Sequence, residues 1–203
     1  MIPFLIGITG GSGSGKTYLS NKIVKHFGPE KITIIQMDSY YKDLKHLPMK
    51  EREKNNFDHP NAFDFKLLNN HLKTLLSKKE INLPVYDYKT HTRMLEIKKI
   101  CITPIILIEG IFALYDKQLR NLMHLKVFID TPDIIRKQRR IDRDKRNRAR
   151  DLDSILNQYK KTVAPMFKEY INPMKDIADL VISENKKKDA YINKLFKYIN
   201  SNL

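Results

Sequence analysis

Eight residues near the start of the chain constrain its fold more than any other feature. They are Gly10, Gly11, Ser12, Gly13, Ser14, Gly15, Lys16 and Thr17, which fit the pattern GxxxxGK[S/T]. A β-type apolar run, Phe4–Thr9, precedes them, and Thr17–Phe27 has helical spacing. Glycines let successive backbone N–H groups surround phosphate oxygens, and the following helix adds its positive end. In such a loop Lys16 reaches the β- and γ-phosphates and the Thr17 hydroxyl is a Mg²⁺ ligand, so the sequence predicts a nucleoside triphosphate site.

Short apolar runs alternate with helical spacing along most of the 203 residues, a length that fits one domain. With the phosphate loop, this alternation indicates an α/β fold of the P-loop NTPase/kinase type, a parallel sheet covered by helices on both faces. The segment 39–102 interrupts the alternation, so we expect a substrate-specific insertion there within a single domain, 1–203. Two β-rich runs in the insertion, Ile81–Tyr88 and Met94–Ile102, could pair as a hairpin. The other expected strands are Ile32–Met37, Ile105–Ile108, Leu125–Ile129 and Leu180–Ile182, and the other expected helices are Met49–Asn55, Phe65–Leu76, Asp151–Tyr170 (with a break at Pro165) and Asp189–Asn200.

Cysteine content and hydropathy exclude several classes of protein. Cys101 is the single cysteine, so an intramolecular disulfide is impossible and a thiolate zinc site is disfavoured. The strongest apolar stretch, Ile100–Ile108, is too short to span a bilayer, and the first residues lack the basic region of a secretory signal. We therefore expect a cytoplasmic protein without a membrane partner.

The chain carries a net charge of +15. Such a charge fits a nucleic-acid-binding protein, an enzyme for polyanionic small molecules, or a lysine-rich solvated surface. Residues 136–150 contain nine Lys or Arg and two Asp, a net +7, so nearly half of the excess is concentrated there. A nucleic-acid-binding ATPase would interleave stacking aromatic residues with this run, and it contains none, which argues against a nucleic-acid partner.

The spacing of the arginines suggests a role for this basic segment. Arg136, Arg139, Arg140 and Arg143 recur at three- and four-residue intervals, so several share one helix face. Arginines can bind the transferring phosphoryl group and the leaving diphosphate bidentately. Together with the phosphate loop, this favours an arginine-rich lid over about 136–150 that closes on the triphosphate and excludes water. The alternative is a solvated basic face.

Three apolar strands end in an acidic residue, Asp38, Glu109 and Asp130. The active site of a parallel sheet lies beyond the carboxyl ends of its strands. Phosphoryl transfer to an alcohol needs a base and a carboxylate that supports Mg²⁺, and Asp38 and Glu109 are the candidates for these roles. Asp130 is followed by Thr131-Pro132, which is typical of a helix start, so we set it aside.

Further short motifs follow one another in a fixed order along the chain. They are Gln36-Met37-Asp38-Ser39-Tyr40-Tyr41, Asn56-Phe57-Asp58-His59-Pro60 with Ala62-Phe63-Asp64, Leu83-Pro84-Val85-Tyr86-Asp87-Tyr88 with His91-Thr92-Arg93, Ile108-Glu109-Gly110-Ile111, Arg139-Arg140-Ile141-Asp142-Arg143-Asp144 and Gln158-Tyr159. In residue type and order they resemble the uridine kinase (uridine–cytidine kinase) family of P-loop nucleoside kinases over nearly the whole chain. The resemblance implies Mg²⁺-dependent phosphorylation of uridine and cytidine at the ribose 5′-OH by ATP or GTP, giving UMP or CMP in pyrimidine salvage. It also implies a homotetramer.

The resemblance assigns roles to individual positions. Asp38 corresponds to the catalytic base, Glu109 to the acid that supports Mg²⁺, and Arg143 and Arg148 to lid arginines near the phosphates. The implied nucleoside-binding residues are Phe57, Asp58, Tyr86, Tyr88, His91, Arg140, Arg150 and Gln158. Among these, Asp58 would hold the ribose 2′- and 3′-hydroxyls with Arg140 nearby. Tyr86 and His91 would read the pyrimidine edge, and the rings of Phe57 and Tyr88 would flank the base.

Two segments depart from the family pattern. The family has Glu-Arg-Gly-Arg where this chain has Asn147-Arg148-Ala149-Arg150, and Pro-Arg-Gly where it has Ser183-Glu184-Asn185 followed by Lys186–Lys188. The second segment borders the donor base in the family, so ATP and GTP both remain candidates.

Three other functions fit the sequence less well. A phosphoribulokinase-like or pantothenate kinase-like function would leave the segment Tyr86–Arg93 without a role. A regulatory GTPase would carry Asn-Lys-x-Asp, and 185–188 fails at its fourth position.

Overall fold

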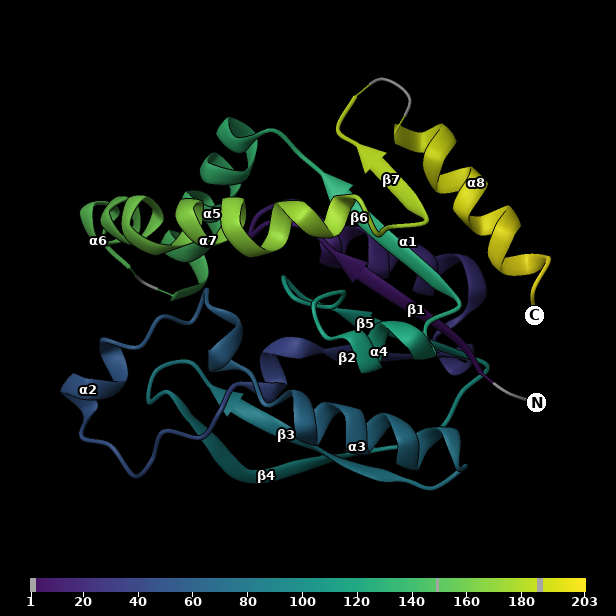
Figure 1. Cartoon of the computed structure of the whole chain (residues 1–203), viewed down its shortest axis with the longest axis horizontal. Helices are drawn as coiled ribbons and strands as arrows, with labels where there is room; N and C mark the ends of the chain where they lie inside the picture. The colour runs from purple at the N-terminus through teal and green to yellow at the C-terminus, as the bar shows by residue number, and fades with distance from the viewer. Residues whose placement is uncertain (1–2, 149, 186–187) are drawn as a thin grey trace.

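A five-stranded sheet with the order β2-β5-β1-β6-β7 forms the centre of the structure (Figure 1). This computed structural model describes residues 3–148, 150–185 and 188–203, with the backbone alone for 147 and 148. All strand pairs in the sheet are parallel, as predicted. The strands are β1 (Phe4–Thr9), β2 (Ile32–Gln36), β5 (Ile105–Glu109), β6 (Leu125–Asp130) and β7 (Leu180–Ser183).

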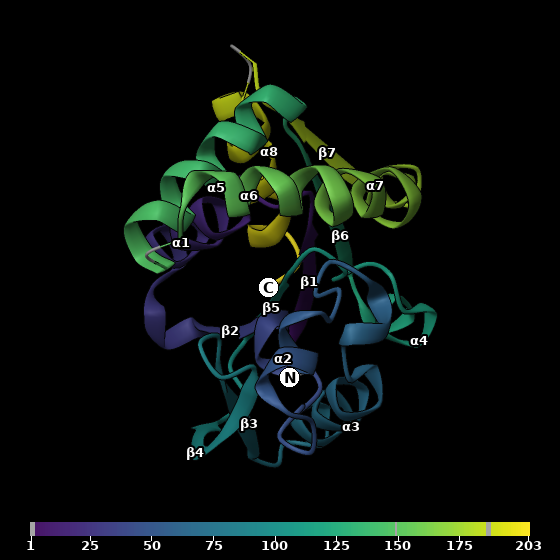
Figure 2. The same ribbon diagram turned by 90° about the vertical axis from the view of Figure 1, so that its left-hand side faces the viewer.

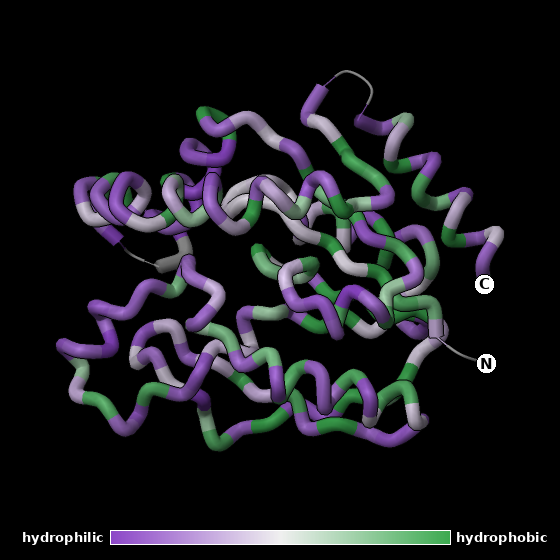
Figure 3. Tube along the Cα trace, viewed as in Figure 1, coloured by the Kyte–Doolittle hydropathy of each residue, from purple (hydrophilic) through white to green (hydrophobic). Residues whose placement is uncertain are grey.

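Helices cover both faces of the sheet, because side chains alternate along its buried strands. Ile6 of β1 packs with apolar residues of α1 (Lys16–Phe27) and α8 (Lys188–Asn200) on one face. Leu5 belongs to a second cluster on the other face, which includes α3 (Phe65–Leu76). Figure 2 shows this arrangement from the side, and in Figure 3 hydrophobic residues gather in the central strands. This confirms the predicted α/β architecture.

The insertion between β2 and β5 contains the predicted hairpin. Strands β3 (Ile81–Asp87) and β4 (Thr92–Ile100) pair antiparallel as a separate two-stranded sheet. The register shifts between Pro84 and Tyr86, and Tyr86 joins the core cluster that includes α3. The insertion also holds the short elements η2 (Met37–Tyr40), α2 (Met49–Glu53) and η3 (Pro60–Ala62).

The second half of the chain differs from expectation in two places. The helix α4 (Lys117–Leu122) was not predicted, although Asp116 caps it by accepting a hydrogen bond from the backbone N–H of Leu119 at 2.8 Å.

The predicted helix 151–170 is not uniform. It runs as α6 (Leu152–Gln158), a π turn η4 (Tyr159–Val163), α7 (Ala164–Met166), a second π turn η5 (Phe167–Ile171) and the 3₁₀ turn η6 (Asn172–Lys175). Pro165 lacks an N–H, and widened turns on both sides of it let the helical path continue instead of breaking.

The basic segment forms most of one helix, α5 (Asp133–Arg148). In Figures 1 and 2 it lies beside α6. The predicted lid at 136–150 is therefore helical through Arg148, and Ala149, where the family has glycine, lies outside the described residues. Of Lys186–Lys188, the first two also lie outside them. Across the described residues, no helix combines the length and apolar character needed to cross a bilayer.

Candidate active site

The phosphate loop connects β1 to α1, where the sequence placed it. Gly15 has left-handed backbone angles and precedes the first residue of α1, so the positive end of that helix points at the loop. The Lys16 Nζ donates hydrogen bonds to the carbonyl oxygens of Gly10 and Gly11, both at 3.0 Å. Burial lowers the pKa of Lys16 to about 8, although the nearby carboxylates of Asp38 and Glu109 oppose this shift.

Arg136 lies beneath the phosphate loop, which corrects its assignment to the phosphate-binding lid. It is 2% exposed, and its guanidinium stacks 3.7 Å from the ring centre of Phe167. Its Nε donates to the carbonyl of Thr131 at 3.0 Å. A Cβ atom on Gly11 would collide with the Arg136 guanidinium, and one on Gly13, whose φ is +79°, would collide with its carbonyl oxygen. Gly11 and Gly13 therefore have a second task besides leaving room for phosphate. Without side chains they let α5 pack directly against the loop.

Thr131, directly after β6, holds the phosphate loop in place. Its hydroxyl donates to the carbonyl oxygen of Ser14 at 3.0 Å, and it is 3% exposed. The neighbouring acid Asp130 instead forms an ion pair with Lys175 at 2.7 Å. This ion pair gives Asp130 a structural role, which agrees with its exclusion from the catalytic candidates.

Glu109, the last residue of β5, lies beside Thr17 in the first turn of α1. The Thr17 hydroxyl donates to Oε1 of Glu109 at 3.3 Å, and the Ser20 hydroxyl donates to Oε2 at 2.6 Å. Gln36 Nε2 also donates to Oε1, at 3.3 Å. Glu109 is 6% exposed. A hydroxyl and a carboxylate this close offer the hard oxygen ligands that suit Mg²⁺, which usually keeps several waters and few protein ligands. The described residues contain no cluster of three or more His, Cys, Asp or Glu able to enclose a metal.

Asp38 lies in η2, directly after β2. The hydroxyl of Tyr88 donates to its Oδ2 at 3.2 Å, so the hairpin contacts the predicted base. The Tyr88 ring meets the Tyr86 ring edge to face, with centroids 5.6 Å apart. The predicted catalytic and nucleoside-binding positions are thus adjacent, although Tyr88 reaches Asp38 through its hydroxyl rather than offering only a ring face.

Aromatic residues from the insertion gather beside Asp38. Phe57 stacks on His91 with centroids 4.6 Å apart and an interplanar angle of 17°. Tyr41, which was not among the predicted site residues, lies between Phe57 and Tyr86, at 5.5 and 5.1 Å. Burial lowers the pKa of His91, which favours its neutral imidazole. The buried hydroxyl of Tyr86 has no hydrogen-bond partner among the described residues.

Polar residues from α5 and α6 complete the arrangement. Nη1 of Arg140 donates to Oγ of Ser12 at 2.9 Å and lies 3.8 Å from Oδ1 of Asp58. Gln158 Oε1 accepts hydrogen bonds from Arg140 Nη2 at 3.0 Å and from Arg150 Nη1 at 2.6 Å. The structure therefore brings together the predicted set Asp58, Arg140, Arg150 and Gln158.

The two predicted lid arginines lie elsewhere or outside the description. The Arg143 guanidinium pairs with the Asp144 carboxylate, with N–O distances of 2.8–2.9 Å. The side chain of Arg148 lies outside the described residues.

Two residues of this network were not predicted: Asp144 and Thr162. The Thr162 hydroxyl donates to Oδ2 of Asp58 at 3.1 Å, and no sequence signal indicates it. Asp144 had a usable signal, because it follows Arg140 by four residues, the spacing of paired charges on a helix.

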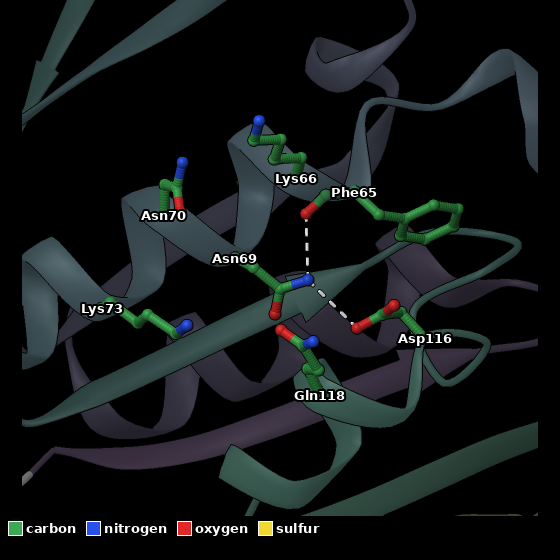
Figure 4. A pocket seen from close by; sticks show the side chains of 7 residues that line it. All are labelled: Phe65, Lys66, Asn69, Asn70, Lys73, Asp116 and Gln118. Carbon is green, nitrogen blue, oxygen red and sulfur yellow. Dashed lines mark hydrogen bonds between the residues drawn. The ribbon is translucent and has the colours of Figure 1, made fainter.

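A separate surface groove of about 260 Å³ lies between α3 and the start of α4 (Figure 4). It contains none of the predicted site residues. Asn69 donates hydrogen bonds there to the carbonyl of Phe65 at 2.9 Å and to Asp116 at 3.0 Å. The groove therefore marks a structural contact between the two helices.

The chain is similar to known proteins over most of its length. The family described as "Phosphoribulokinase / Uridine kinase family" matches residues 5–190. A uridine kinase from Clostridium novyi (strain NT) is 49% identical over 184 residues, covering 91% of this chain and 88% of that protein. A uridine kinase from Ligilactobacillus salivarius (strain UCC118) is 47% identical over 193 residues, covering 95% and 91%.

A solved structure shows the same fold at low sequence identity. Phosphoribulokinase from Rhodobacter spheroides has a TM-score of 0.55 and 15% identity, with 83% of this chain and 68% of that chain covered. The phosphate loop, the strand-end acids and the extent of the family match lead to one conclusion: this chain is an enzyme that belongs to the phosphoribulokinase/uridine kinase family.

Proposed function

We propose that the chain transfers the γ-phosphoryl group of ATP or GTP to the 5′-hydroxyl of uridine or cytidine, giving UMP or CMP. The contact that carries this proposal is made by Arg140, which bonds to Ser12 of the phosphate loop and approaches Asp58 of the insertion. A triphosphate on the loop would thereby lie next to a carboxylate suited to ribose hydroxyls. The uridine kinases of 47–49% identity support a pyrimidine nucleoside as the acceptor.

In the proposed reaction, Asp38 accepts the proton of the ribose 5′-hydroxyl while that oxygen attacks the γ-phosphorus. Lys16 and Arg143 stabilise the charge on the transferring group and on the leaving diphosphate. Lys16 already lies over the loop carbonyls of Gly10 and Gly11, so a short movement of its ammonium would meet the phosphates. Arg148 is proposed for the same task. The remaining loop residues, from Gly10 to Thr17, bind phosphate oxygens mainly through their backbone N–H groups.

Thr17 and Glu109 would hold Mg²⁺, with Thr17 as the direct ligand and Glu109 supporting it. When bound there, the ion would supply positive charge that offsets the negative charge of the phosphates. The 3.3 Å separation between the Thr17 hydroxyl and Glu109 is compatible with this role, because the carboxylate keeps the hydroxyl oriented from a buried position.

Nucleoside recognition in this proposal follows from buried polar groups. Asp58 accepts hydrogen bonds from the ribose 2′- and 3′-hydroxyls, and its fixed partner Thr162 keeps it in place. Tyr86 and His91 bind the polar edge of the pyrimidine, with Phe57 and Tyr88 against its ring. Arg150 and Gln158 contact the nucleoside from the α5–α6 side, where they already bond to each other.

A steady-state assay of ADP or GDP release tests the proposal. Purified protein with Mg²⁺ and either ATP or GTP is given uridine, cytidine, thymidine, adenosine, guanosine and ribulose 5-phosphate. We expect turnover with uridine and cytidine and none with the others. Turnover with ribulose 5-phosphate alone, or none with either pyrimidine ribonucleoside, would contradict the proposed substrate class.

A further inference from the structure

One buried carboxylate near the site has no role in the proposed reaction. Asp144 in α5 is 0% exposed. Nε and Nη2 of Arg143 lie 2.9 and 2.8 Å from its Oδ1, and Nε of Arg140 lies 3.6 Å from its Oδ2. A carboxylate removed from water in this way persists only when positive charges compensate it.

A third arginine reaches the same carboxylate from beyond the end of α5. Nη1 of Arg150 lies 3.6 Å from Oδ2 of Asp144, and the Arg150 backbone N–H donates to the Asp144 carbonyl at 3.3 Å. Three guanidinium groups therefore gather on one acid. Two of them also extend toward Gln158 at 2.6–3.0 Å, and Arg140 extends further to Ser12.

We propose that Asp144 is a positioning residue that holds Arg140, Arg143 and Arg150 in the arrangement that phosphoryl transfer uses. This inference rests on the proposed function, because that reaction is what requires the three arginines. Guanidinium groups repel one another, and each long side chain loses rotamer freedom when it is held in place. A shared buried counter-charge fixes them before the substrates bind, which is the condition for effective electrostatic catalysis.

This role has a kinetic signature that general loss of structure would not produce. The negative charge of Asp144 opposes a bound triphosphate while it orders the arginines. Its neutralisation should therefore leave the KM for ATP unchanged or lower. The same change should lower kcat, through Arg143, and raise the KM for uridine, through Arg140 and Arg150.

The test compares Asp144→Asn with Asp142→Asn. Asp142 lies on the same helix, two residues away, and accepts a hydrogen bond from Gln138 at 3.0 Å rather than from the site arginines. We expect Asp144→Asn to lower kcat by about 10- to 100-fold and to raise the KM for uridine about tenfold, without raising the KM for ATP. Asp142→Asn should change each constant by less than about twofold.

A second variant covers the case in which Asp144→Asn does not fold. Asp144→Glu keeps the charge but displaces the arginines by one methylene, so it should lower kcat several-fold, again without raising the KM for ATP. Thermal unfolding identifies the folded variants. A folded Asp144→Asn or Asp144→Glu with the kinetic constants of Asp142→Asn would overturn the proposal, and so would a rise in the KM for ATP alone.

Failure of the proposed function gives a different result. Wild-type protein that binds ATP but phosphorylates no pyrimidine nucleoside would refute the function itself. The positioning role would then be judged by the ATP dissociation constant measured by calorimetry. Tighter ATP binding by Asp144→Asn than by Asp142→Asn would support that role, whereas equal or weaker binding would refute it.

Discussion

Nη1 of Arg140 donates a hydrogen bond to Oγ of Ser12 over 2.9 Å, so a buried side chain of α5 is joined to the phosphate loop. The same guanidinium lies 3.8 Å from Asp58 and donates to Gln158 at 3.0 Å. Its planar fork reaches groups in different directions at once, which a lysine ammonium on a single stem cannot do. Arg140 therefore connects the nucleotide and nucleoside sides of the candidate site.

We expect Arg140→Lys to raise the KM for uridine by about 10- to 100-fold, because charge-assisted hydrogen bonds on both sides are lost while the charge remains. The matched control is Arg139→Lys. Arg139 is its sequence neighbour, but it is exposed and pairs with Glu184 at 3.1 Å. The control should stay within about twofold of wild type. Steady-state kinetics with uridine varied at saturating ATP provide the measurement, and equal effects of the two substitutions would refute the connecting role.

Asp38→Asn should lower kcat by about 10²- to 10⁴-fold, since it removes the proton acceptor while keeping the size of the side chain. Tyr88 can still donate its hydrogen bond to the remaining oxygen, so the KM for ATP should change little. Asp130→Asn is the control, because Asp130 also ends a strand but pairs with Lys175. Near-normal turnover of Asp38→Asn would rule out its role as the base.

Asp58→Ala should raise the KM for uridine strongly and reduce the preference for uridine over 2′-deoxyuridine. A site that binds hydroxyls rejects an analogue without them because its own buried polar groups are left unpaired, and Asp58 is 7% exposed. The informative quantity is the ratio of kcat/KM for the two nucleosides. An unchanged ratio would show that Asp58 does not bind the 2′-hydroxyl.

The sequence predicted the strands, the hairpin and the phosphate loop because their signals are local. Apolar runs bounded by glycine or acidic residues locate β1, β5 and β6 to within about a residue. Whether an individual arginine is buried or exposed depends on tertiary contacts instead. Arg136 and Arg139 have the same chemistry and share a helix, yet Arg136 is buried against Phe167 and Arg139 is exposed. That difference depends on how η5 packs on α5, which periodicity does not encode.

Nucleotide affinity should depend on the protonation of Lys16. In the folded chain its pKa is lowered from 10.5 to about 8, so above pH 8 the free protein loses the ammonium that attracts phosphate. If only the protonated form binds, the ATP dissociation constant should rise about tenfold per pH unit above pH 8. Calorimetry between pH 7 and 9 measures this. Lys16→Arg, which stays charged, should show a flat profile over the same range, and a wild-type profile equally flat would contradict the assignment.

Tyr86→Phe should separate recognition from stability. The buried Tyr86 hydroxyl has no partner among the described residues, so its removal costs the fold no hydrogen bond, and the melting temperature should stay the same or rise. The KM for uridine should rise about tenfold if this hydroxyl binds the pyrimidine.

Tyr40→Phe is the matched control and should show the opposite pattern, a less stable fold with little change in the KM for uridine. Its buried hydroxyl pairs with Nδ1 of His71 at 3.0 Å, so the loss should destabilise the fold by about 1–3 kcal/mol and leave the KM for uridine within about twofold. Thermal unfolding and uridine kinetics on both variants make the comparison, and an unchanged KM in Tyr86→Phe would remove this hydroxyl from the nucleoside site.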